Sequence, residues 1–377
     1  MKTISLILLI SFAFSVNAQK SQIPKEKFLT MKMQKYPIVD DFETTKTISD
    51  INVIQLVSDS FRLGYSTKGG NDYVATINTD KPLTDFLQQH LKKMYKNQFK
   101  KGGSKILLVL NELREGEKDS YMPYAYHDVY TYTLLNADTY ISENENLFTK
   151  VFSIDSVFVN QLNITTREHA ENIEKALKFL VKKTILYGEP AGEEIADKMT
   201  TEQIVKNSKL QLKRNEPILT NEFYKDGAYK NFQEFLNNNP SITDFEPIVS
   251  KKKKIDIINT AKDTIEIWGF CKNGEIYKYY ENVLVPIEKQ GNGFIISDYV
   301  ENKTRRNKNL KNAALVGLVA GSAIGIVAGG AIGSIFNVTA WFREGKPLLV
   351  KSYSYIDDAK HQPEATCINM RTGEFSF

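Results

Sequence analysis

Five glycines recur at every fourth residue within an uncharged stretch of the chain. Residues 313–336 contain no Asp, Glu, Lys or Arg, and the repeat consists of Gly317, Gly321, Gly325, Gly329 and Gly333. Residues four apart share one face of a helix, so these glycines would form a flat stripe on which another helix packs closely. This glycine zipper predicts association with membrane lipid, and contact with another membrane helix or a second copy of the chain.

The first 18 residues have the pattern of an export signal. Lys2 supplies the positive charge, residues 4–14 form an apolar run, and Val16-Asn17-Ala18 is a small-residue cleavage site. The mature chain would therefore begin at Gln19. The residue directly after Ala18 is Gln19 and not a cysteine, so this position lacks the thiol that a lipid anchor requires. If a membrane holds this protein, the zipper segment must do it.

The zipper segment is long enough to cross a bilayer. A helix over residues 313–336 would be about 36 Å long, against a hydrocarbon core of about 30 Å. Its many glycines make the insertion energy marginal, so a partner helix would be needed. The basic residues of 305–311 favour a cytoplasmic start, whereas an exported N-terminal region favours the outside. Four interpretations stay open: a single span, a hairpin broken at Gly329-Gly330, a self-associating or membrane-surface insertion, and a buried packing element.

Two cysteines, Cys271 and Cys367, flank this segment in predicted strands. In an oxidising compartment they form a possible disulfide, which would keep both flanks on one side of a membrane and exclude a single crossing. The alternative is a pair of buried thiols that never meet.

Charge and length narrow the class of protein. Without Lys2, 48 basic residues stand against 45 acidic ones, a net charge of +3 that does not favour nucleic-acid binding.

The sequence divides into several parts. After the signal peptide (1–18), we expect an extended lead-in (19–50), an α+β domain (51–190), a linker (191–215) and a β-rich domain (216–377). The β-rich domain would be interrupted by the hydrophobic zipper helix.

The predicted fold class is α+β, with helices covering one face of the first sheet. Strands are expected at 51–65, 73–77 and 106–110, and an antiparallel pair at 121–140 and 147–160. Asp80 would cap a first helix whose buried face includes His90, and Thr165 with Glu168 would form a capping box for a second helix. The linker would contain one or two helical turns.

The second domain carries strand patterns at 255–259, 264–271, 275–280, 283–287, 294–296, 348–356 and 366–370. A short helix is expected around Phe232 and Phe235. Asn273-Gly274 should form a tight hairpin turn, because both residues accept positive φ angles.

No catalytic, cofactor or metal site emerges from the sequence. The four histidines, His90, His127, His169 and His361, have no second histidine or cysteine at metal-ligand spacing. Residues 102–105 superficially suggest a phosphate loop but precede a strand, so they indicate a helix stop. We expect a non-enzymatic protein without a cofactor.

Tyrosines cluster between residues 121 and 140. Tyrosine offers flat apolar area with a polar tip, so the cluster is a possible recognition surface; tyrosine is also a favoured strand residue, which is the alternative. The residues concerned are Tyr121, Tyr124, Tyr126, Tyr130, Tyr132 and Tyr140.

The order of elements over residues 82–187 resembles the small α+β domain of bacterial envelope auxiliary lipoproteins, except for the missing lipidation cysteine. The patterns at 224–229, at Phe232 and Phe235, and at 268–271 are similar to those of uncharacterised exported bacterial proteins. The resemblance implies an exported, membrane-associated protein of the bacterial cell envelope with a scaffold or assembly role. A secreted membrane-inserting or permeabilising factor and a soluble periplasmic binding module are the alternatives.

Overall fold

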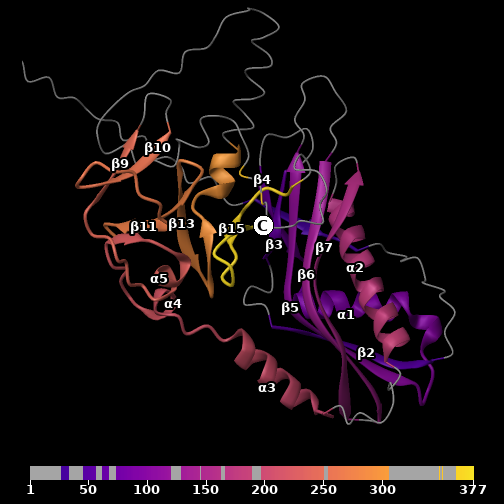
Figure 1. Cartoon of the computed structure of the whole chain (residues 1–377). Coiled ribbons are helices and arrows are strands. Elements are labelled where there is room, and N and C mark those ends of the chain that lie inside the picture. The colour runs from indigo at the N-terminus through magenta and orange to yellow at the C-terminus, as the bar shows by residue number, and fades with distance from the viewer. Residues whose placement is uncertain are drawn as a thin grey trace, which may run out of the picture.

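The computed structural model describes residues 27–33, 46–56, 62–67, 74–119, 129–144, 146–162, 166–188, 197–249, 254–304, 348, 350 and 362–377. The signal peptide, most of the lead-in and the whole zipper segment lie outside these residues. Two sheets stand side by side, and the C-terminus lies between them (Figure 1).

The first sheet contains seven strands. They are β1 (Phe28–Met31), β2 (Ile48–Gln55), β3 (Arg62–Thr67), β4 (Val74–Thr79), β5 (Ser104–Asp119), β6 (Val129–Asn144) and β7 (Leu147–Leu162). Their order is β1-β4-β3-β5-β6-β7, and β2 also pairs with β5. The long strands β5, β6 and β7 pair antiparallel in succession, and β7 lies at the edge of the sheet. Along one edge of β5, β2 pairs with residues 104–110 and β3 reaches Glu115.

Helices α1 (Leu83–Met94) and α2 (Thr166–Tyr187) cover one face of this sheet. Leu87, Leu91 and Met94 of α1 are fully buried, as are Ile173 and Leu180 of α2, because they recur at helical spacing on one side. The expected face of the first helix is confirmed. Its start differs, since Pro82 occupies the N-cap position and makes no side-chain cap hydrogen bond. The capping box expected at Thr165 lies outside the described side chains.

The second sheet also contains seven strands, in the order β16-β15-β14-β13-β12-β11-β8. They are β8 (Gly227–Tyr229), β11 (Gly269–Lys272), β12 (Glu275–Tyr280), β13 (Val283–Gln290), β14 (Gly293–Ile296), β15 (Cys367–Ile368) and β16 (Phe375–Ser376). A ribbon of β9 (Phe245–Val249) and β10 (Ile255–Asn259) packs on one face. Short helices α4 (Pro217–Thr220) and α5 (Phe232–Leu236) precede and follow β8.

The hairpin turn between β11 and β12 agrees with the sequence. Asn273 has φ 55° and Gly274 has φ 79°, the positive values that a tight Asn-Gly turn requires. The strand expected at 264–271 is shorter, because only Gly269–Lys272 pairs as β11. Of the strand expected at 348–356, the structure describes only Leu348 and Val350, and both are buried.

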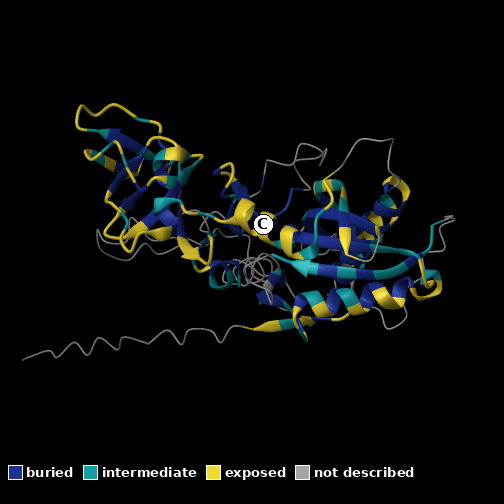
Figure 2. Cartoon of the chain, turned by 90° about the horizontal axis from the view of Figure 1, so that it is seen from below, coloured by how far each residue is buried: buried dark blue, intermediate teal, exposed yellow. Residues whose placement is uncertain are grey.

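The two sheets share one hydrophobic core. Tyr65, Tyr132 and Leu134 of the first sheet pack in the same cluster as Val285 and Phe294 of the second. Figure 2 shows buried residues concentrated along the strands, whereas the helices carry alternating buried and exposed residues. The face of the first sheet that α1 and α2 leave open is therefore covered in part by the second sheet.

Residues 197–215, the described part of the expected linker, contain a helix. Helix α3 (Thr201–Leu212) begins with a complete capping box between Thr200 and Gln203. Its Ile204 is buried against Leu107 and Val109 of β5. The helix is longer than the one or two turns expected from the sequence, because three turns pack on the first sheet.

Candidate functional site

A cluster of buried charged residues lies where the two sheets meet. Glu115 and Glu117 come from β5, His169 from α2, Lys303 from the helical turn at 299–304, and Glu364 from the segment before β15. Each of the five is at most 5% exposed. We call these residues the junction cluster.

The first-sheet side of the junction cluster is a histidine between two carboxylates. His169 Nδ1 lies 2.8 Å from Glu115 Oε2, and its Nε2 lies 3.5 Å from Glu117 Oε2. Ser66 Oγ donates to Glu117 Oε2 at 2.9 Å, and Thr133 Oγ1 donates to Glu115 Oε1. The two glutamates are two residues apart on a strand, so both reach the same face, the one that α2 covers.

The other side of the junction cluster is a lysine between two carboxylates. Lys303 Nζ lies 3.3 Å from Glu364 Oε2 and 3.8 Å from Glu117 Oε1. The Tyr299 ring lies 5.7 Å from the same ammonium. Glu117 therefore contacts both cations and links α2 to the helical turn at 299–304.

Burial and pairing set the protonation states. Burial lowers the pKa of His169, but hydrogen bonds and attraction from Glu115 and Glu117 outweigh it and raise the pKa to about 9. Burial raises the pKa of Glu115, and its hydrogen bond with His169 offsets this only in part. His169 is thus a cation at neutral pH. The cluster thus sets His169 and Lys303 against three carboxyl groups.

The junction cluster fastens the two ends of the insertion that contains the zipper. Lys303 precedes residues 305–347, and Glu364 follows residues 351–361. Near the same place, Ala365 N donates to Leu348 O at 2.7 Å, and Val74 N donates to Thr304 Oγ1 at 3.2 Å. Because its members are buried and paired, the cluster is suited to holding segments together rather than to contacting a substrate.

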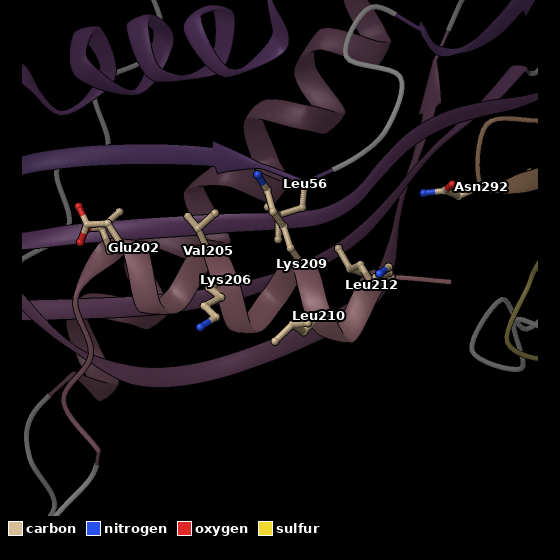
Figure 3. Close-up of a pocket in the computed structure, with 10 residues that line it drawn as sticks. Leu56, Glu202, Val205, Lys206, Lys209, Leu210, Leu212 and Asn292 are labelled. Atoms are coloured by element: carbon tan, nitrogen blue, oxygen red, sulfur yellow. The ribbon is translucent and has the colours of Figure 1, made fainter. Parts of the chain in front are cut away.

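A surface groove follows α3 (Figure 3). Its volume is about 750 Å³. Its lining is apolar at Leu56, Val205, Leu210 and Leu212, basic at Lys206, Lys209 and Lys213, and otherwise consists of Thr201, Glu202 and Asn292. Lys206 and Lys209 are three residues apart on α3 and so are neighbours on its surface, and their side chains point in different directions beside the apolar lining (Figure 3). Three lysines against one glutamate make the groove cationic.

The structure separates the predicted tyrosine cluster. Tyr132 is fully buried, with its ring 5.9 Å from that of Phe377, so the prediction that it belongs to a recognition surface was wrong. Tyr130 is half-buried against the shared core, and Tyr140 is buried near Ile204. The other predicted members, Tyr121, Tyr124 and Tyr126, lie outside the described residues.

Of the two alternatives for the cysteines, a possible disulfide and two buried thiols, the structure has the buried thiols. Cys271 and Cys367 are free and buried, on β11 and β15. Three strands stand between β11 and β15, a separation of roughly 19 Å at the usual strand spacing, whereas disulfides join Cα atoms about 4.4 to 6.8 Å apart. Cys271 Sγ instead contacts Asp226 Oδ1, and burial raises the pKa of this thiol to about 12.

Of the two histidines that the structure describes, His169 is in α2 and His90 contacts α2 from α1. His169 belongs to the junction cluster, and His90 Nε2 of α1 lies 3.3 Å from Glu174 Oε2 of α2. His127 and His361 lie outside the described residues. Within the part of the chain that the structure describes, no group of three or more His, Cys, Asp or Glu side chains is arranged so that it could hold a metal ion.

The zipper glycines Gly317, Gly321, Gly325, Gly329 and Gly333 lie outside the described residues, and their helix stays a prediction. None of the helices that the structure describes combines the length and the apolar character of a membrane span.

Comparisons with known proteins do not assign the chain to a family. No family model matches the chain. No curated protein matches it either. Among solved structures, the chain is similar to a Xanthomonas campestris protein described by the family DUF330, with 12% identity, a TM-score of 0.28, and coverage of 43% of this chain and 97% of that one. The proposals below rest on the chain's own residues.

Proposed function

We propose that this chain is a non-enzymatic protein of the bacterial cell envelope, held at a membrane through its glycine-zipper segment, with a scaffold or assembly role. The export signal and the zipper support the location. The observation that carries the role is the junction cluster, in which Lys303 and Glu364 bind the ends of the insertion to the shared core of two sheets. Such an anchor would fix the position of the membrane segment relative to the two sheets.

Fractionation of bacterial membranes tests this proposal. The full chain should stay in a membrane pellet washed with high salt, because apolar insertion does not weaken with ionic strength. A chain in which a short polar linker replaces residues 313–336 should move to the soluble fraction. If the full chain is also washed off, its attachment is electrostatic or absent, and the zipper anchor is wrong.

A permeabilising factor is the alternative with the same membrane segment. It predicts leakage of a trapped dye from liposomes, and Gly325→Leu should abolish the leakage because leucine fills the close helix contact. The scaffold proposal predicts stable binding without leakage. Measuring both on the same liposomes separates the two.

The groove along α3 supports a second candidate, binding of a single acyl chain with an anionic headgroup. Its apolar lining would hold the chain, and Lys206, Lys209 and Lys213 complement the charge. A fluorescent fatty acid should bind the full chain, and Leu210→Asp should weaken binding at least tenfold. Leu186→Asp on α2 is the control, since Leu186 is also exposed, at 48%, but is not in the groove. Equal effects of the two variants would reject a site at the groove.

A further inference from the structure

The strands on the two sides of the insertion are neighbours in one sheet. β14 and β15 pair antiparallel, with Phe294 opposite Ile368 and Ile295 opposite Cys367. Ile296 N also donates to Thr366 O at 2.9 Å. Paired strands lie about 4.8 Å apart, whereas a hydrocarbon core is about 30 Å thick. A bilayer therefore cannot pass between these strands while the sheet exists.

The residues next to the insertion are held to the same body. Lys303 pairs with Glu364 at 3.3 Å, with side chains 1% and 3% exposed. Leu348 is buried in the shared core and accepts a hydrogen bond from Ala365 N. Placing the two ends on opposite sides of a membrane would separate this ion pair and this hydrogen bond as well as β14 from β15.

We infer that the chain meets the membrane from one side only, so that the segment between Thr304 and Leu348 crosses it an even number of times or not at all. This inference rests on the proposed membrane association. It keeps the basic residues of 305–311 on the exported side, because both sheets must stay together there. Translocation of the folded body then outweighs the local charges.

Two single-cysteine variants test this arrangement in the full, exported chain. Gln290→Cys lies before the insertion at the end of β13, and Thr372→Cys lies after it, in the turn before β16; both positions are exposed. The native Cys271 and Cys367 are buried, so the unmodified chain serves as the blank. The variants are treated with a membrane-impermeant maleimide in cells whose outer membrane has been permeabilised, before and after lysis, and the salt-washed membrane pellet is analysed.

The same-side arrangement predicts equal labelling of the two variants in the pellet before lysis. Labelling of both only after lysis would also support it, while showing that the chain is not exported. Labelling of one variant before lysis and of the other only after lysis would overturn it. Absence of the chain from the pellet would reject the proposed membrane association itself, and the inference with it.

Discussion

Lys303 and Glu364 form an ion pair between two residues that are 61 positions apart and almost completely buried. Lys303 Nζ lies 3.3 Å from Glu364 Oε2, and the side chains are 1% and 3% exposed. The pair is costly to desolvate, so its contribution depends on both partners being present. The pair joins a residue before the insertion to a residue after it, at the place where β14 and β15 also pair.

Glu364→Gln should lower the free energy of unfolding by about 3 to 5 kcal/mol, because it removes the carboxylate that lies 3.3 Å from the buried ammonium of Lys303, nearer than Glu117 at 3.8 Å. The double variant Lys303→Met with Glu364→Leu should recover much of that loss, since no unbalanced cation remains. Denaturant titration of each purified variant measures this. Lys262→Met is the control: its ion pair with Glu246 is 73% and 65% exposed, and its loss should not be measurable. A Glu364→Gln chain as stable as the unmodified one would contradict the role of the pair.

The pKa of His169 makes stability depend on pH. It is about 9 in the folded chain and about 6.5 in an unfolded one. Between these values the folded chain holds a proton that the unfolded chain has released, so stability is fully present below about pH 6.5 and falls as pH rises to 9. The loss amounts to at most about 3 kcal/mol.

His169→Gln should remove this dependence. The variant should be less stable than the unmodified chain at pH 6, and the difference should shrink by pH 9.5. Urea midpoints at a series of pH values give the comparison. A constant difference across the series would mean that His169 gains no stabilising proton on folding.

The helical faces and the tight hairpin could be predicted from the sequence, because their signals are local. Leu87 and Leu91 recur at helical spacing, and Asn273-Gly274 fixes the turn between β11 and β12. The capping box of Thr200 with Gln203 was also readable, and it would have revealed α3.

The junction cluster could not be predicted in the same way, because its members come from four separate segments. Two partial signals existed. Glu115 and Glu117 fall on the same strand face as Leu113, and His169 has helical spacing with the buried Ile173. Each indicates a charge directed into a core, but only the fold shows that Lys303 and Glu364 arrive there to balance it.

Gly116 lies where β5 meets the C-terminal residue. A Cβ at this position would stand 2.5 Å from Phe377 Cδ2 and 2.9 Å from its Cγ. Phe377 is 1% exposed in the shared core, so Gly116→Ala should cost about 1 to 3 kcal/mol through overpacking. Gly293→Ala is the matched control, since its nearest atom is Met370 Cγ at 3.6 Å. Thermal melts compare the two, and equal melting temperatures would show that Phe377 moves aside without cost.

Lys278 of β12 is a buried lysine enclosed by aromatic rings. Its Nζ lies 4.5 Å from the Trp268 ring centroid and 5.4 Å from that of Phe375. Burial lowers its pKa to about 8, although Glu374 opposes the shift. Between pH 8 and about 10.4 the unfolded chain binds a proton that the folded chain has released, so this group makes stability rise with pH.

Lys278→Met should keep the apolar stem between the rings and remove the charge. The stability of the variant relative to the unmodified chain should therefore be greatest near pH 7 and should decline toward pH 10, because the cost of the buried ammonium disappears as the unmodified chain loses its proton. Urea titrations of the two chains at pH 7 and pH 10 isolate this difference from the other titrating groups, which both chains share. A variant less stable than the unmodified chain by the same amount at both pH values would show that contacts of the lysine with the rings, and not its charge, decide its contribution.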